Sequence, residues 1–115
     1  MSFPERRKYP RIRLITKVAH IHGDRFHYFC SRDLSIGGIF LDTEHPYPLG
    51  TKLELELSLP DIADKIKILG EVVRIEPPEA RQEGKSPGMG IQFYDMDNDT
   101  KAMLADFIGR ELAKQ

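Results

Sequence analysis

Segment 52–59 has the most regular pattern in the chain and constrains the fold more than any other feature. It reads Lys-Leu-Glu-Leu-Glu-Leu-Ser-Leu, so that a leucine occupies every second position. Because successive side chains of a strand point to opposite sides, this period of two predicts a β-strand with one buried and one solvated face. A strand of this kind belongs to an antiparallel sheet that covers a single core.

Further runs of strand-forming residues surround this segment and predict a sheet of about six strands. Gly23-Asp24 separates two of these runs as a two-residue turn with glycine first, which is a type II′ hairpin signal. A sheet of this size curls into a barrel to cover its edges, so we expect a mainly β protein with a six-stranded antiparallel β-barrel. The expected strands are 14–22, 25–36, 39–42, 52–59, 66–76 and 88–95.

The hydrophobic period changes near the C-terminus and predicts a helix. Apolar residues recur there at helical spacing, after an Asp97-Asn98-Asp99 run that offers N-cap residues. The apolar residues are Met103, Leu104, Phe107, Ile108 and Leu112. We expect a single domain of 115 residues, with an extended arm over 1–13, a barrel over 14–95 and an amphipathic helix over 97–113. Residues 79–87 are expected to form a polar loop.

Charge is distributed unevenly along the chain. Residues 1–32 carry a net charge of +6 and residues 33–115 carry −7, which gives the total of −1. A basic arm on an acidic body predicts an anionic ligand and disfavours a long nucleic-acid groove. Five of the cations fall within eight residues of the arm: Arg6, Arg7, Lys8, Arg11 and Arg13.

Composition and motifs also exclude several classes of protein. No apolar run approaches the ~20 residues of a membrane helix, and the N-terminus lacks the apolar core of a secretory signal. We therefore expect a cytoplasmic protein without membrane insertion. Cys30 is the single cysteine and is expected to be a buried strand residue. The chain has no H-E-x-x-H, G-x-S-x-G or P-loop motif, so we do not expect an enzyme.

Two short motifs carry residue types suited to a nucleotide ligand. Arg7 and Arg11 lie four residues apart on a backbone that Pro10 keeps out of a helix. Guanidinium groups pair with phosphates and with the O6/N7 edge of guanine. In the second motif Asp33 and Ser35 share one face of a strand, and a carboxylate accepts from guanine N–H groups while a hydroxyl donates to phosphate or sugar oxygens.

The hairpin register assigns the faces of the two strands that flank Gly23-Asp24. Without a bulge, one face carries His20, His22, His27, Asp33 and Ser35. The opposite face carries Ala19, Ile21, Phe26 and Tyr28. The second face is the more apolar, so we expect it in the core and the first face outward, where the arm can fold over it.

The three histidines of the outward face are also a candidate metal site. His20 and His22 lie two apart on one strand, with His27 across from them. Arg25 would lie beside His22, however, and no carboxylate is placed to support the ligands. A polar hairpin surface is the better interpretation, and we expect no metal.

The ordered pair of motifs resembles the PilZ domain family, a bacterial module that binds cyclic di-GMP. Arg7-Lys8-Tyr9-Pro10-Arg11 matches its R-x-x-x-R motif, and Asp33-Leu34-Ser35-Ile36-Gly37-Gly38 matches its D/N-x-S-x-x-G motif. The segments Gly70-Glu71-Val72-Val73-Arg74 and Gly88-Met89-Gly90-Ile91-Gln92-Phe93 are also similar to strands of the family. The resemblance implies the same fold, a six-stranded antiparallel barrel with a C-terminal helix.

The resemblance also implies a role for each motif residue. Arg7 and Arg11 clamp phosphates and guanine edges, while Asp33 and Ser35 hold a guanine and the neighbouring sugar–phosphate. Gly38 leaves room for the ligand. Arg6 lies directly before the first motif, and an arginine at this position resembles the family members that bind two mutually stacked ligands. The expected ligand is cyclic di-GMP, in one or two molecules per chain, with no other cofactor.

The function implied is a cyclic di-GMP receptor that acts on a separate downstream protein in bacterial motility, attachment or exopolysaccharide control. One alternative is a PilZ-like adaptor between proteins that binds no nucleotide, and another is a small-barrel RNA-binding protein. The acidic body and the lack of an aromatic row on the outer face disfavour nucleic acid. The two complete motifs favour the receptor over the adaptor. We expect a monomer or a weak homodimer.

Overall fold

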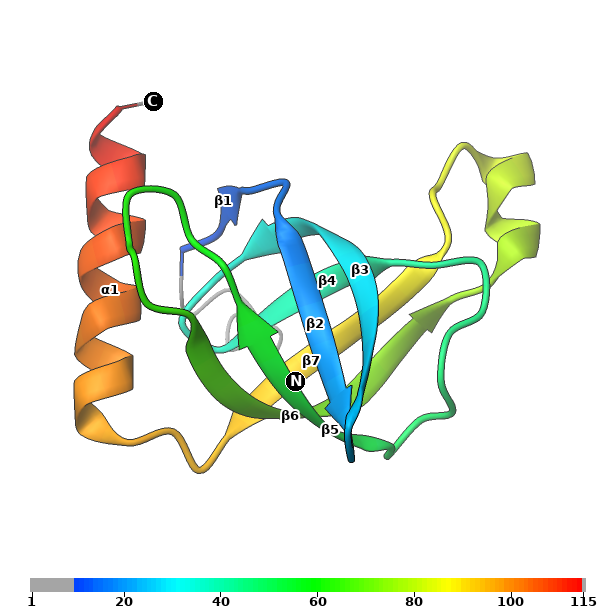
Figure 1. Ribbon diagram of the computed structural model, residues 1–115. Coiled ribbons are helices and arrows are strands. Elements are labelled where there is room, and N and C mark those ends of the chain that lie inside the picture. Colours follow the sequence, from blue (N-terminus) through cyan, green and yellow to red (C-terminus); the bar gives the residue numbers. More distant parts are fainter. Residues whose placement is uncertain (1–9, 115) are drawn as a thin grey trace, which may run out of the picture.

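The computed structural model describes residues 10–114, which form a closed β-barrel with one α-helix beside it (Figure 1). A 3-10 helix, η2, covers Pro78–Glu83, and the α-helix, α1, covers Asn98–Ala113. The strands of the described residues are β1 (Ile12–Arg13), β2 (Lys17–His22), β3 (Arg25–Leu34), β4 (Gly38–Asp42), β5 (Lys52–Leu57), β6 (Ile66–Glu76) and β7 (Gly88–Tyr94).

The strands are paired antiparallel in the order β1-β3-β2-β5-β6-β7-β4, and a further pairing of β3 with β4 closes the barrel. Six strands make up the barrel, and β1 is an additional short strand paired with the end of β3. The prediction of a six-stranded antiparallel barrel with a C-terminal helix is therefore confirmed. Several predicted bounds were wrong. Ile12 and Arg13, assigned to the arm, form β1, and the loop expected over 79–87 contains η2. The strands expected over 14–22, 25–36 and 52–59 are shorter, at Lys17–His22, Arg25–Leu34 and Lys52–Leu57.

The regular leucine pattern of 52–59 fills the barrel as predicted. Leu53, Leu55, Leu57 and Leu59 are all buried. The same core receives Leu104, Phe107 and Ile108 from α1. The helix begins after Asp97, whose side chain accepts a hydrogen bond of 2.7 Å from the Thr100 amide, and this bond lowers the pKa of Asp97. Neither helix of residues 10–114 is long and apolar enough to cross a membrane.

The β2–β3 hairpin has the predicted register but the opposite orientation. His22 pairs with Arg25, and Gly23 has a φ of 65°, as the first position of a type II′ turn requires. Of the four residues expected in the core only Ala19 is buried, whereas Phe26 and Tyr28 are 48% and 56% exposed. The prediction of the faces was therefore wrong.

The partner strand β5 explains the reversal. Val18 and His20 pair with Leu57 and Leu55, which point into the barrel. Because paired residues of antiparallel strands point to the same side, Val18 and His20 point inward as well. The face that carries Tyr28 is thus the outer one, and Cys30, which shares it, is exposed rather than buried.

The inward histidine is accommodated at the hairpin end of the barrel. The His20 Nδ1 atom lies 3.0 Å from the Tyr47 hydroxyl, and the rings of His22 and His27 lie 6.0 and 6.1 Å from the His20 ring. Burial lowers the pKa of His20, and the neighbouring His27 and His22 lower it further. Within residues 10–114 no group of three or more His, Cys, Asp or Glu side chains is arranged to hold a metal ion.

This arrangement predicts a pH-dependent stability. The pKa of folded His20 lies below the ordinary value of 6.5, so the unfolded chain binds more protons in acid. The free energy of unfolding should therefore fall as the pH drops through about 6.5, where unfolded His20 becomes protonated. In His20→Gln this fall should be shallower. Urea unfolding between about pH 5 and 7.5 measures it, with the exposed His45→Gln as control. Equal slopes in wild type and His20→Gln would contradict the assignment.

Candidate ligand-binding site

A β-bulge in β3 determines which side chains face outward at the second motif. The pairing of β3 with β4 shifts between Ser31 and Asp33, so Arg32 is an extra residue on β3. Ser31 and Leu34 are buried, whereas Arg32 and Asp33 are both half-exposed. Asp33 therefore points outward, as predicted. The reason differs from the prediction. His20, expected on the same face as Asp33, points inward, and Asp33 points outward only because the bulge changes the side on which β3 residues project.

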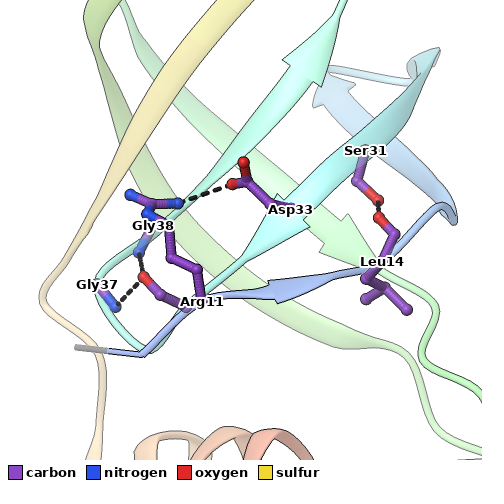
Figure 2. A network of polar contacts seen from close by, with 7 residues as sticks. Arg11, Leu14, Ser31, Asp33, Gly37 and Gly38 are labelled. Carbon is purple, nitrogen blue, oxygen red and sulfur yellow. Dashed lines mark hydrogen bonds and ion pairs between the residues drawn. The ribbon is translucent and has the colours of Figure 1, made fainter. Parts of the chain in front are cut away.

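The short strand β1 brings the end of the first motif onto this surface. Arg13 pairs with Asp33 in the β1–β3 register, and the Leu14 amide donates to the Arg32 carbonyl over 3.1 Å. The buried Ser31 hydroxyl donates to the Leu14 carbonyl and so holds the same segment against the barrel (Figure 2). The chain before β1 consequently starts from a defined position beside β3.

Arg11 and Asp33, one from each motif, form an ion pair. The Arg11 Nη1 atom lies 2.7 Å from Asp33 Oδ1, and Figure 2 shows the arginine extending along the outer surface toward the carboxylate. Both side chains are partly solvent-exposed, at 49% and 33%. A ligand that reaches this surface can therefore contact the guanidinium and the carboxylate together.

Ser35 lies differently from the sequence prediction. Its side chain was expected to point outward, but Ser35 is 3% exposed. Its hydroxyl oxygen accepts hydrogen bonds from the amides of Gly37 and Gly38, over 3.1 and 3.2 Å, and its own amide donates to the Gly38 carbonyl. Ser35 thus holds the turn between β3 and β4, a local bond of the kind that serine forms in turns.

Gly38 is required by packing of the barrel itself. A Cβ atom at this position would lie 2.2 Å from the Ile91 carbonyl oxygen on β7. Gly38 pairs with Gln92 in the β4–β7 ladder, so neither strand can retreat without losing hydrogen bonds. The glycine of the second motif therefore permits the close approach of β4 and β7. This packing role is independent of any space that Gly38 leaves for a ligand.

Next to Asp33 the outer surface carries a stack of three side chains that sequence reasoning missed. The guanidinium carbons of Arg32 and Arg74 lie 4.1 and 5.1 Å from the centroid of the Phe40 ring. Arg32 also donates to Asp42 Oδ1 from Nε, over 3.0 Å. The bulge that turns Arg32 outward has no sequence signal of its own, and Arg74 comes from a distant strand.

A concave surface lies on the other side of the Ser35 turn. It is a groove of about 580 Å³ between α1 and the end of β7. Its apolar lining includes Ile36, Met96 and Ala102, and its charged residues are Asp95 and Lys101. These two charges balance, so the groove does not favour an anion as the arginine-bearing surface does.

Of the six residues predicted for the site, the structure describes four. It brings Arg11 and Asp33 into contact and places Ser35 and Gly38 in the adjoining turn. Arg6 and Arg7 lie outside the described residues. The ligand-binding role of all six remains a prediction.

Comparisons with known proteins agree with this fold. A family model described as the PilZ domain matches residues 5–110. No curated protein gives a significant match. The PilZ domain with c-di-GMP of YcgR from Escherichia coli is 16% identical, with a TM-score of 0.72 over 95% of this chain and 93% of that chain.

Two longer proteins have similar structures. The Bacillus subtilis inhibitor of motility MotI/DgrA is 23% identical, with a TM-score of 0.72 over 95% of this chain and 53% of its own. The MrkH–c-di-GMP complex of K. pneumonia is 19% identical, with a TM-score of 0.73 over 94% of this chain and 53% of its own. The chain thus spans about half the length of these two proteins, and the likeness to all three structures is one of fold.

The close approach at Gly38 generates a test that separates packing from binding. Gly38→Ala should lower the free energy of unfolding of the ligand-free protein by ~1–3 kcal/mol, because the added Cβ atom meets backbone that cannot move freely. The control is Gly109→Ala on α1, where a Cβ meets nothing within 4 Å and alanine favours the helix. Urea unfolding measures both. A Gly38→Ala variant as stable as wild type would show that β4 and β7 have more room than the structure gives them.

Proposed function

This chain belongs to the PilZ domain family, and we propose that it is a receptor for cyclic di-GMP, acting by binding and not by catalysis. The ligand contains two guanine bases and two phosphates. The family match supports the proposal, as do the YcgR and MrkH structures, which have the same fold and contain c-di-GMP. The proposed site comprises Arg6, Arg7, Arg11, Asp33, Ser35 and Gly38.

The observation that carries the proposal is the Arg11–Asp33 contact, which joins the two motifs at one point. Arginine donates to the O6/N7 edge of guanine. A carboxylate accepts from the guanine N–H groups. One guanine can therefore be held from two sides by a pair that is already assembled at 2.7 Å. Arg6 and Arg7 would add the cations that two phosphates need.

Ser35 and Gly38 contribute to this site by shaping it. The Ser35 turn and the close β4–β7 contact fix the backbone beside Asp33. The Ser35 hydroxyl uses its lone pairs for two amides, so its own hydrogen is available to a phosphate or sugar oxygen. In this proposal both residues preorganise the surface, which reduces the entropy lost on binding.

The output of such a receptor is a changed contact with another protein. We propose that the ligand, held between the barrel and the arginines Arg6 and Arg7, creates a new surface for a separate partner. The MotI structure is named for an inhibitor of motility, which supports motility as one regulated process, beside attachment and exopolysaccharide control. The protein would act in the cytoplasm as a monomer or weak homodimer.

Isothermal titration with cyclic di-GMP tests the proposed ligand. We expect saturable binding to cyclic di-GMP and none to GTP or to a short RNA. Arg7→Ala and Arg11→Ala should each weaken binding ~10-fold or more, because each removes a bidentate guanidinium contact. The thermal midpoint of Arg11→Ala without ligand should stay near wild type, since an exposed ion pair contributes little.

The matched control for these variants is Arg110→Ala, which removes an equally exposed, ion-paired arginine from α1. It should bind as wild type does. A wild-type protein that produces no heat with cyclic di-GMP would contradict the receptor and favour the nucleotide-free adaptor, for which the next experiment is capture of a partner protein.

The residue before the first motif determines the ligand stoichiometry in this proposal. We expect about two cyclic di-GMP molecules per wild-type chain and about one for Arg6→Leu, because leucine cannot donate to the second, stacked ligand. Titration with the protein concentration well above Kd measures the ratio directly. An unchanged ratio in Arg6→Leu would remove the stacked pair from the account while leaving binding itself intact.

A further inference from the structure

A continuous row of paired residues crosses the outer surface of the barrel from Asp33 to Arg74. Asp33 on β3 pairs with Phe40 on β4, Phe40 pairs with Gly90 on β7, and Gly90 pairs with Arg74 on β6. Paired residues of neighbouring strands point to the same side of a sheet, so all four share one face. Arg74 thus belongs to the same surface as Asp33, although three strand spacings, roughly 14 Å, separate their backbones.

Two glycines in β7 bring the Arg74 side chain back toward Asp33. A Cβ atom on Gly90 would lie 3.3 Å from the Arg74 Cβ atom and 3.4 Å from its Nε atom. A Cβ atom on Gly88 would overlap the Phe40 ring, at 2.4 Å from Cε1. Because both positions lack a side chain, the Phe40 ring can lie close to β7, and the Arg74 side chain can cross β7 to reach the ring. The guanidinium is therefore held next to the strand that pairs with Asp33.

Phe40 is covered from outside by two cations. The ring points outward yet is only 2% exposed, because Arg32 and Arg74 lie over it. Arg32 has other partners, the Asp42 carboxylate and the Ser86 carbonyl. Arg74 is exposed, and no carboxylate of residues 10–114 forms an ion pair with it. Among residues 10–114, the exposed Arg74 guanidinium thus lies over an aromatic ring without a side-chain hydrogen bond or ion pair.

We propose that Arg74 contacts the ligand, and that its guanidinium stacks on a guanine base of cyclic di-GMP held by Arg11 and Asp33. Guanidinium planes stack on base planes, because every nucleobase has a π-face. Phe40 and Gly90 are positioning residues, because they hold the guanidinium over the ring of the residue that pairs with Asp33. This inference rests on the proposed function and adds a contact from a strand that neither motif contains.

Titration with cyclic di-GMP tests the contact through three variants of the full chain. Arg74→Ala should bind about 5- to 30-fold more weakly than wild type. Arg74→Lys should be nearly as weak, because an ammonium keeps the charge but has no plane to stack. Gly90→Ala should also bind more weakly, since its methyl group displaces the arginine without removing it. Arg110→Ala on α1 is the control and should bind as wild type does.

The outcomes separate this inference from the proposed function. If wild type binds and Arg74→Ala binds within about twofold of it, the Arg74 contact is wrong and the receptor stands. If Arg74→Lys restores full affinity, the residue acts as a point charge on a phosphate and the stacking is wrong. Wild type that does not bind cyclic di-GMP overturns both. Thermal melts of each variant without ligand show whether a loss of binding reflects a loss of fold.

Discussion

The bulge at Arg32 is the local feature on which the candidate site depends. A single extra residue in β3 changes the side on which its side chains project, so that Ser31 remains in the core while Asp33 faces solvent. Without it, Asp33 would continue the inward row of β3 that includes His27 and Ser31, and would point into the barrel. The bulge also places Arg32 over the Phe40 ring, where it forms part of the neighbouring surface.

The candidate binding surface is assembled from strands that are distant in sequence but adjacent in the barrel. β1 brings Arg11 to Asp33, and the β4–β7 and β6–β7 pairings bring Arg74 toward the same place. Glycines make these approaches possible, since Gly38 and Gly90 each stand where a Cβ atom would crowd a neighbour. In the proposed site, packing requirements of the barrel and geometric requirements of the ligand therefore fall on the same positions. A variant at Gly38 consequently has to be judged on stability before it is judged on binding.

The sequence predicts those parts of the fold that follow from strong periodicity. The leucines of β5 predict the strand and its inward face, and the Gly23-Asp24 turn predicts the hairpin register. The orientation of that hairpin was predicted wrongly because counting apolar residues favoured Phe26 and Tyr28. The histidine face can point inward because the Tyr47 hydroxyl, at the end of the barrel, is a hydrogen-bond partner for His20. The sequence of the hairpin itself does not indicate that partner.

The site is predictable from its motifs only in part. The two motifs indicate which residues gather, and the structure places Arg11 against Asp33. They do not indicate that Ser35 is buried in a turn or that Arg74 reaches the same surface. The first depends on local hydrogen bonds to Gly37 and Gly38, and the second depends on tertiary pairing across three strands.

The central claim is that Arg11 and Asp33 bind one guanine as a unit, and a double-mutant cycle on cyclic di-GMP affinity tests it most directly. The affinities of wild type, Arg11→Ala, Asp33→Ala and the double variant are measured by titration. If the pair acts as a unit, the double variant should lose little more affinity than the weaker-binding single variant, so the two losses are strongly non-additive. Losses that simply add would show that the two residues contact the ligand independently, and would contradict the account.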